Sequence, residues 1–428
     1  MTKGSRIWLI GLGLSAVLAT VLAVLVILNA VPAPKRVAEP VGEVPAVGSD
    51  EFRHLQSVLL GSAAAPGNRI EVLQNGEEIY AAKLEAIEQA NESITFETFE
   101  FWGEEVGGAF AEALANAAER GVAVHAIFDY VGSIQAGQEK FRQMEEAGVE
   151  VVRWREPSWY QLSRFNSRTH RKLLVVDGRV GFTGGANVAD AWQGSPETGG
   201  YRDNHYRFEG PVVAELQNAF MLNWLNATSQ LLYTTTYFPL LEARGELDAK
   251  VVNSSPREGK HRIRMMLLLA MAGAREHIRL ASPYFYPDEM IMEALLEARG
   301  RGVEVDLLLP AEGLYSTAFR EASRNRWGAL LEAGVRIHEY QPSKYHAKLY
   351  LIDDEWVSIG SSNLDNRSFR LNDETNVIIM DPDLAATLTT QFERDLEQAD
   401  AYTLEAWETR SLPRRVLGWL TMSIGWHL

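Results

Sequence analysis

The sequence predicts an α/β protein whose body consists of two similar α-β-α sandwich lobes, preceded by one N-terminal transmembrane helix. Apolar segments with strand character alternate with segments of helical periodicity, a pattern typical of parallel sheets that helices cover on both faces. This alternation occurs twice along the chain, which indicates a duplicated body. A charge-free segment near the N-terminus predicts the additional helix.

The N-terminal segment, residues 7–31, carries no charged side chain. At about 1.5 Å of rise per residue, a helix of this length crosses a hydrocarbon core of about 30 Å. It is also longer than the apolar region of a secretory signal, which has about 7–15 residues. We therefore expect an uncleaved signal anchor, with a cleaved or lipid-modified signal as the alternative. Basic residues flank both sides, and their balance slightly favours a cytoplasmic N-terminus, a single-pass topology in the cell membrane and an extracytoplasmic body.

The rest of the chain divides by composition and periodicity. The expected parts are a signal anchor, a linker, a first lobe, a helical connection, a second lobe and a C-terminal segment, at residues 1–31, 32–50, 51–210, 211–260, 261–400 and 401–428. The linker is rich in Pro, Val, Ala and Gly and should be an extended tether. The end of the chain, "RRVLGWLTMSIGWHL", combines two arginines with two tryptophans. It is either an interfacial membrane segment or a terminal helix docked on the body.

Composition excludes several classes of protein. The chain has 428 residues, 46% of them hydrophobic, which is ample for a large core. Its net charge of −16 argues against a nucleic-acid partner, because phosphate binding relies on clustered Lys and Arg. The sequence contains no cysteine, which excludes disulfides, thiolate metal sites and a cysteine nucleophile. We expect neither a cofactor nor a metal, and the oligomeric state stays open.

The duplication is visible element by element. The strand, helix and strand of each pass are expected at residues 93–99, 106–121 and 122–129, and at residues 277–285, 289–302 and 303–310. Each pass continues with a helix that ends in Ala-Gly-Val. Gly121 matches Gly302, and Gly148 matches Gly334, in positions where glycine closes a helix before a strand.

One polar pattern occurs at equivalent places in both passes. The first copy is "THRKLLVVDGRVGFTGGAN" and the second is "YHAKLYLIDDEWVSIGSSN". The shared positions are His170, Lys172, Asp177, Gly184, Gly185 and Asn187 in the first copy, and His346, Lys348, Asp353, Gly360, Ser361 and Asn363 in the second. A single chance His-x-Lys-x4-Asp would occur in roughly one such chain in a hundred. Two copies in a duplicated fold therefore indicate a functional site.

The spacing suits phosphate chemistry. His-x-Lys on a strand places both side chains on one face. The second strand of the expected hairpin ends in small residues, where the backbone can approach a phosphate closely. The asparagine adds amide donors. If the two lobes face each other, the site between them contains two imidazoles, two ammonium groups and two amides.

Two histidines suit phosphodiester exchange without a metal. One imidazole can attack phosphorus and form a covalent phosphohistidine. The other can protonate the leaving alkoxide and then deprotonate the incoming alcohol or water. The lysines and asparagines would stabilise the charge on the non-bridging oxygens. The two copies are chemically alike, so the spacing alone does not order the histidines.

A carboxylate downstream of a histidine can fix its tautomer. Glu374 lies twenty-eight residues after His346, and Asp203 is its looser counterpart after His170. Asp177 and Asp353 either take part in the chemistry or organise the turn at the end of their strand.

Other charged residues near the motifs are open to interpretation. Arg164, Arg168 and Arg171 surround the first motif; they either attract anionic headgroups, which we favour, or form a solvated face. Arg367 should form an ion pair with Asp365. His205 lies outside the pattern, and we expect a structural role for it.

The paired motifs resemble the phospholipase D superfamily, whose signature is a duplicated His-x-Lys-x4-Asp followed by Gly-Gly/Ser and Asn. The stretches "SSNLDNRSFRLNDETN", "SPYFYPDE", "NSRTHRKLLVVDG" and "YRDNHYRFEGP" are similar to its bacterial cardiolipin synthase branch. The resemblance implies a phosphatidyl transferase that joins two molecules of phosphatidylglycerol, an anionic phospholipid of the membrane, into cardiolipin and releases glycerol. It also implies that His170 is the nucleophile and His346 the acid/base. Many members of the branch have two N-terminal transmembrane helices or none, whereas one is expected here.

The sequence leaves three functions open. The first is the phosphatidyl transferase, with a phospholipase D-type hydrolase as the variant in which water is the acceptor. The second is a nuclease or other phosphodiesterase with the same core residues. The third is a lipid-binding scaffold on an inactive fold, which the completeness of both motifs disfavours.

Overall fold

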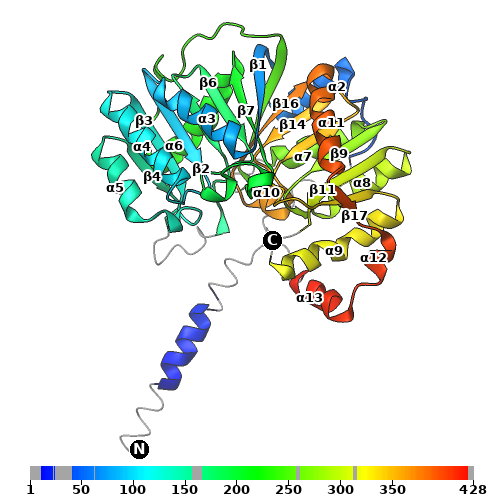
Figure 1. Cartoon of the computed structure of the whole chain (residues 1–428). Helices are drawn as coiled ribbons and strands as arrows, with labels where there is room; N and C mark the ends of the chain where they lie inside the picture. The colour runs from blue at the N-terminus through cyan, green and yellow to red at the C-terminus, as the bar shows by residue number, and fades with distance from the viewer. Residues whose placement is uncertain are drawn as a thin grey trace, which may run out of the picture.

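The computed structural model describes residues 11–22, 24, 41–61, 63–156, 166–256, 261–311 and 316–422. Within them, fifteen strands form one continuous mixed sheet, which helices cover on both faces (Figure 1). The α/β class expected from the sequence is confirmed. The two lobes are not separate sheets, however, because their central strands pair with each other.

The strand order of the sheet repeats about its centre. The first half runs inward as β4 (Glu150–Trp154), β3 (Ala123–Asp129), β2 (Ser93–Thr98), β5 (Leu173–Val176), β6 (Val180–Gly184), β7 (Asn204–Glu209) and β1 (Ala65–Gln74). The second half runs inward as β12 (Arg336–Tyr340), β11 (Glu304–Pro310), β9 (His277–Ala281), β13 (Leu349–Ile352), β14 (Trp356–Gly360), β16 (Glu374–Met380) and β8 (Leu247–Ser254), with β17 (Ala399–Ala401) added outside β12. Strand by strand, the two halves are equivalent.

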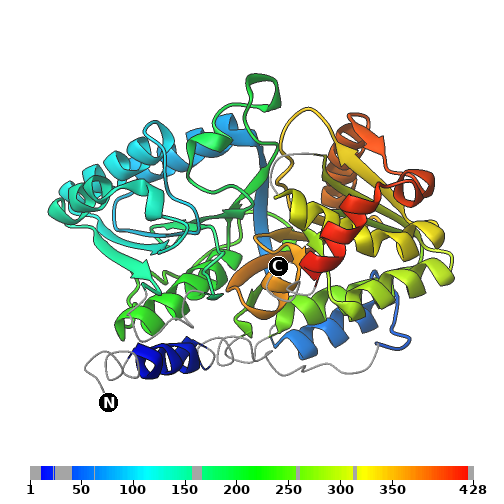
Figure 2. The same ribbon diagram turned by 90° about the horizontal axis from the view of Figure 1, so that it is seen from below.

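The halves meet where β1 pairs antiparallel with β8. Figure 2 shows β1 between the first half on the left and the second on the right. Only part of the sheet is parallel. Each half has three parallel strands, β2–β3–β4 in the first and β9–β11–β12 in the second, and the hairpin that follows them is antiparallel. The added strand β17 is also antiparallel. A separate two-stranded sheet joins β10 (Phe285–Tyr286) to β15 (Leu364–Asp365).

Helices flank each half in the same order. The first half has α3 (Asn75–Glu88), α4 (Val106–Glu119), α5 (Gln138–Glu146) and α6 (Val212–Thr228); the second has α7 (Arg262–Gly273), α8 (Glu289–Gly300), α9 (Thr317–Glu332) and α11 (Pro382–Leu396). The remaining helices are α2 (Asp50–Leu60), α10 (Asn366–Arg370), α12 (Leu404–Glu408) and α13 (Leu412–Met422), with short 3-10 turns at Ile134–Ala136, Asp190–Trp192 and Pro196–Thr198. Alternate side chains of each strand face opposite layers of helices, as the period of a strand requires.

One hydrophobic core crosses the junction between the halves. It packs Phe220 and Trp224 of α6 together with Leu388 and Phe392 of α11 against the same face of the sheet. The opposite face has a core of its own in each half, under α3–α5 and under α7–α9. The shared core makes the two halves one body and fixes the loops at their junction relative to each other.

Two of the expected boundaries differ from the structure. Residues 211–260 are more than a connection, because α6 is the counterpart of α11 and β8 is a central strand of the second half. The second half begins inside this segment, because β8 pairs with β16 of that half. Phe52 and Leu60 of α2 belong to the core of the second half, although α2 precedes the first half in sequence.

Both ends of the chain lie partly outside the described residues. The expected membrane segment, residues 7–31, is described only at residues 11–22 and 24, which are helical and exposed. Among the described residues, no helix is both long enough and apolar enough to span a membrane. At the other end, α13 packs along α9 through Gly418, where a Cβ atom would lie 2.5 Å from the Glu321 carbonyl oxygen. Residues 423–428 of the expected interfacial segment are not described.

Candidate active site

Each motif histidine lies on a segment that crosses to the other half of the molecule. The His170 N–H donates to the carbonyl of Asp373, at 2.9 Å, and the His346 N–H donates to the carbonyl of Arg202, at 2.7 Å. The flanking residues form parallel bridges, Thr169 with Asp373 and Arg202 with Tyr345. The backbone thus brings both motifs together between the halves, as the sequence predicts.

The two histidines take their carboxylate partners from the opposite half. His170 Nδ1 lies 2.9 Å from Oε1 of Glu374, and His346 Nδ1 lies 2.7 Å from Oδ2 of Asp203. Both carboxylates were expected as histidine partners, but each in its own repeat. The pairing is crossed because of where the two carboxylates lie on their strands. Asp203 lies just before β7 and Glu374 begins β16, and at both points the chain runs beside the motif of the other half.

Further donors hold both carboxylates in place. Glu374 accepts hydrogen bonds from the hydroxyls of Ser361, at 2.5 Å, and Ser368, at 2.7 Å. Asp203 accepts from Trp192 Nε1, at 2.8 Å, and from the Asn204 N–H, at 2.8 Å. Several donors hold a buried carboxylate in one orientation. Each is therefore fitted to hold an Nδ1–H and leave Nε2 of its histidine exposed to a substrate.

One small residue of each motif lies against a carboxylate, and the glycine before it lies against a neighbouring strand. A Cβ on Gly185 would lie 2.1 Å from Oδ1 of Asp203, so only glycine leaves room for that carboxylate. Ser361, the equivalent residue, instead donates its hydroxyl to Glu374. Gly184 and Gly360 lie against neighbouring strands, where a Cβ would approach backbone atoms to 2.6 and 2.3 Å. The expectation that the backbone at these positions approaches a phosphate stays a prediction.

The two lysines lie beside their histidines, as two-residue spacing on an extended chain requires. Lys172 Nζ donates to the carbonyl of His170, at 2.8 Å, and Lys348 Nζ to the carbonyl of His346, at 2.7 Å. Lys348 Nζ also lies 3.2 Å from Nε2 of His346. Both ammonium groups are almost fully buried, so an anion entering the site would meet poorly screened positive charge.

Burial shifts the pKa of all four basic side chains. It lowers the pKa of His170 to about 4 and that of His346 to about 3, with the neighbouring lysines adding to the effect and the carboxylates opposing it. It lowers the pKa of Lys172 to about 8 and that of Lys348 to about 7. Both imidazoles are therefore neutral near pH 7, and Nε2 carries a lone pair.

The motif asparagines position neighbouring loops. The side-chain oxygen of Asn187 accepts the N–H of Glu100, at 3.1 Å. The backbone N–H of Asn363 donates to the hydroxyl of Ser368, at 3.0 Å, and its amide lies 3.4 Å from Asp365. These contacts place both asparagines at the edge of the histidine site.

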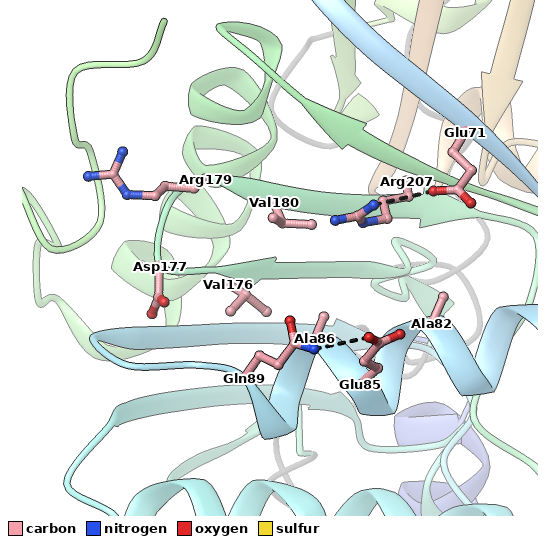
Figure 3. Close-up of a pocket in the computed structure, with 10 residues that line it drawn as sticks. All are labelled: Glu71, Ala82, Glu85, Ala86, Gln89, Val176, Asp177, Arg179, Val180 and Arg207. Atoms are coloured by element: carbon pink, nitrogen blue, oxygen red, sulfur yellow. Dashed lines mark hydrogen bonds and ion pairs between the residues drawn. The ribbon is translucent and has the colours of Figure 1, made fainter. Parts of the chain in front are cut away.

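Asp177 and Asp353 are turn residues. Both have a positive φ, 51° and 53°. The Asp177 carboxylate accepts three backbone N–H groups of residues 91–93, and that of Asp353 accepts those of residues 275–277. Each lies seven residues after its histidine, about 20 Å along an extended chain. Asp177 lines a separate hollow of about 320 Å³ together with residues of α3 and of the neighbouring strands, and Figure 3 shows these side chains. The structure thus favours the turn role and not the chemical one.

The arginines near the first motif have different surroundings. Arg171 is buried and donates to the carbonyl of Ala219, at 2.6 Å, so it does not attract headgroups. Burial lowers the pKa of Arg168, and the charge of Asp129 offsets part of this shift. Arg367 donates to the carbonyl of Asn166, at 3.1 Å. Burial lowers the pKa of Arg367, and the charge of Asp365 opposes this shift. Arg164 is outside the described residues. His205 is fully buried, outside the histidine pairs.

Sequence reasoning missed the side chains that surround the histidines. The ring of Phe99 lies 5.2 Å from that of His170, and the ring of Trp192 lies 4.9 Å from that of His346. Tyr201 and Glu100 also lie beside the histidines and lysines of the site. The available signal was position, since Phe99 and Glu100 directly follow the carboxyl end of a parallel strand, where α/β proteins place ligand sites.

Comparison with known proteins agrees with this geometry. The family model described as "Cardiolipin synthase, PLD-like domain" matches residues 84–220 and 267–396. The chain is 35% identical to cardiolipin synthase 1 of Staphylococcus epidermidis, over 81% of this chain and 71% of that protein. It is 36% identical to cardiolipin synthase A of Pseudomonas putida, over 79% and 70%. The chain belongs to the phospholipase D-like cardiolipin synthase family.

A solved structure supports the fold of this cardiolipin synthase family member. The phosphatidylserine synthase of Haemophilus influenzae Rd KW20 superposes with a TM-score of 0.67 at 13% identity, over 89% of this chain and 100% of that one. At such low identity the likeness concerns the fold alone. It shows that this chain and that synthase share their overall fold.

Proposed function

We propose that this cardiolipin synthase family member transfers a phosphatidyl group from one phosphatidylglycerol to another, forming cardiolipin and releasing glycerol. The observation that carries the proposal is the pair of buried histidines, each held by a carboxylate of the opposite half and each next to a buried lysine. Such a site offers one nucleophile and one acid/base to a single phosphodiester.

In the first step, Nε2 of His170 attacks phosphorus of the donor lipid. The Nε2–P bond forms and the bond from phosphorus to the glycerol oxygen breaks. His346 protonates that oxygen, so glycerol leaves neutral. The substrate's own negative charge raises the pKa of His346 towards the range that this step needs. Lys172 and Lys348 stabilise the charge on the non-bridging oxygens.

In the second step, a hydroxyl of the acceptor phosphatidylglycerol attacks the phosphohistidine. His346 takes the hydroxyl proton, the new P–O bond forms, and the Nε2–P bond to His170 breaks. Glu374 keeps the proton on Nδ1 of His170 throughout, which favours the imidazolium that results when phosphorus is attached. The order of the histidines follows the family resemblance.

Membrane attachment would bring this site to its lipid. We assign residues 7–31 as the anchor, with the body extracytoplasmic. α13 adds an exposed apolar surface, where Leu412, Trp419 and Leu420 are 71, 70 and 56% exposed, next to Arg414 and Arg415. Apolar and aromatic side chains flanked by arginine suit the interface of an anionic bilayer. Vesicle flotation tests this surface, because Trp419→Glu should weaken binding to phosphatidylglycerol vesicles.

Incubation of the purified protein with phosphatidylglycerol vesicles tests the transferase. We expect cardiolipin and free glycerol in equal amounts. Phosphatidic acid as the main product would identify a hydrolase, and faster cleavage of single-stranded DNA than of lipid would identify a nuclease. His346→Ala should accumulate protein phosphorylated on His170, whereas His170→Ala should form none; the reverse would exchange their roles.

A further inference from the structure

Glu100 places an acidic side chain beside the two buried lysines of the site. Its backbone is fixed from both sides, because its N–H donates to Asn187 Oδ1 and its carbonyl accepts the Val188 N–H, each at 3.1 Å. One carboxylate oxygen, Oε2, accepts from Trp102 Nε1 at 3.2 Å. No donor from the described residues reaches the other oxygen. The backbone of Glu100 is thus fixed beside the lysines, and its carboxylate carries a negative charge that would oppose the binding of a phosphate there.

The duplication identifies the counterpart of Glu100. At the carboxyl ends of the equivalent strands, Thr98 donates its hydroxyl to the carbonyl of Glu100, at 3.1 Å, and Ser282 donates to that of Tyr284, at 2.8 Å. Glu100 and Tyr284 are therefore equivalent positions that approach the site from opposite halves. The histidines and lysines obey the internal symmetry, and this pair breaks it.

Both side chains remain accessible. The histidines and lysines of the site are buried, whereas Glu100 and Tyr284 are partly exposed, as are Phe99, Trp102 and Tyr201 around them. The charge of Glu100 is felt by both lysines and by Tyr284, since all three interact electrostatically with it. The ring of Phe99, the residue before Glu100, lies 5.2 Å from that of His170, so Glu100 lies beside the histidine site.

We propose that Glu100, with Tyr284 opposite, forms the subsite for the polyol of the acceptor, in which the carboxylate accepts a hydrogen bond from the glycerol hydroxyl that does not react. The inference rests on the proposed function and specifies its acceptor. A glycerol headgroup has two free hydroxyls. One loses its proton to His346 on attack, and the other donates to Glu100. Water and monohydric alcohols lack the second hydroxyl, so they gain nothing from this contact.

A competing explanation is that Glu100 only offsets the charge of Lys172 and Lys348. The two explanations differ in their effect on acceptor choice. Donor phosphate binding is common to every acceptor, so a change in lysine charge alters all reactions in proportion. Loss of a hydroxyl partner alters only reactions with polyols. The ratio between acceptors therefore separates the two.

The experiment uses the full chain with phosphatidylglycerol in mixed micelles and three competing acceptors. Labelled glycerol reports polyol transfer as exchange into phosphatidylglycerol, ethanol reports monohydric transfer as phosphatidylethanol, and water reports hydrolysis as phosphatidic acid. A hydrogen bond to a charged group contributes roughly ten- to a hundred-fold in rate. We expect Glu100→Ala to lower the glycerol-to-ethanol ratio by that factor, with a smaller effect for Glu100→Gln and for Tyr284→Phe.

Glu104→Gln is the matched control, because Glu104 lies on the same loop and its exposed side chain pairs with Lys140. Its ratio should equal that of the wild type. An unchanged ratio in Glu100→Ala, or a parallel loss for all three acceptors, would overturn the acceptor subsite while leaving the transferase intact. A wild-type protein that hydrolyses phosphatidylglycerol but exchanges no glycerol would instead contradict the proposed function itself, and the subsite with it.

Discussion

Asp203 and His346 come from opposite halves of the chain, 143 residues apart, yet Oδ2 and Nδ1 lie 2.7 Å apart. Glu374 and His170 repeat this relationship in the other direction. The same arrangement is thus built twice across one junction, and each half supplies the histidine of one pair and the carboxylate of the other.

The crossed pairing predicts which residues are coupled. Asp203→Asn should impair His346, and Glu374→Gln should impair His170, each lowering kcat roughly 10²- to 10⁴-fold because the imidazole loses its tautomer partner. In double mutants, Glu374→Gln should add little to the loss in His170→Ala. Steady-state kinetics on phosphatidylglycerol measures this. Coupling of Glu374 to His346 instead would favour pairing within each repeat.

The two small residues should respond differently to substitution. Gly185→Ser places a Cβ where Asp203 Oδ1 lies, so we expect loss of most activity and a lower Tm. Ser361→Ala removes one donor to Glu374 and should cost about 1–3 kcal/mol of transition-state or folding free energy. Activity assays with thermal unfolding distinguish them. Full activity in Gly185→Ser would show that the carboxylate can move aside.

The motif aspartates should affect stability rather than catalysis. Asp177→Ala and Asp353→Ala each remove three backbone contacts and place alanine at positive φ, where it is strained. We expect each to lower the free energy of unfolding by about 1–3 kcal/mol, with kcat per folded molecule close to that of the wild type. Denaturant titration beside kinetics tests this. A loss of kcat at full stability would restore a chemical role.

The lysines should set the alkaline limit of activity. Their pKa values, about 8 for Lys172 and about 7 for Lys348, lie below the ordinary value, so both ammonium groups lose their protons as pH rises through this range. Because neutral lysine no longer attracts phosphate, kcat/KM should fall between about pH 7 and 9. Lys348→Arg, which stays charged, should move the decline to higher pH even if its maximum is lower. A decline at the same pH would assign it to another group.

The sequence was informative wherever the two repeats agree. The α/β class follows from the alternation of strand and helix patterns, and the convergence of His170 and His346 follows from residues that recur at one spacing. The crossed carboxylates could not be read in the same way, because Glu374 is nearer in sequence to His346 and nothing in the spacing shows that the chain passes the other half's motif. Asp177 recurs at the same spacing as the histidines, but the structure gives it a role in a turn.

Positions where the repeats differ were the hardest to interpret. Glu100 is matched by Tyr284, so no repeated letter marked it. The residues of β8, LDAKVVNS, do not alternate between apolar and polar, so the sequence predicts a connection there. α2 packs on the half that follows it only because the chain doubles back, which local periodicity does not record.

The antiparallel joint between β1 and β8 has a consequence for the covalent chain. A cut in the largely exposed stretch between α6 and β8, at residues 229–246, would give two fragments, each with one histidine whose carboxylate resides on the other fragment. Neither fragment would turn over lipid by itself. Catalysis would be a property of their complex, so that the rate on mixing would report directly on how well the two fragments reassociate.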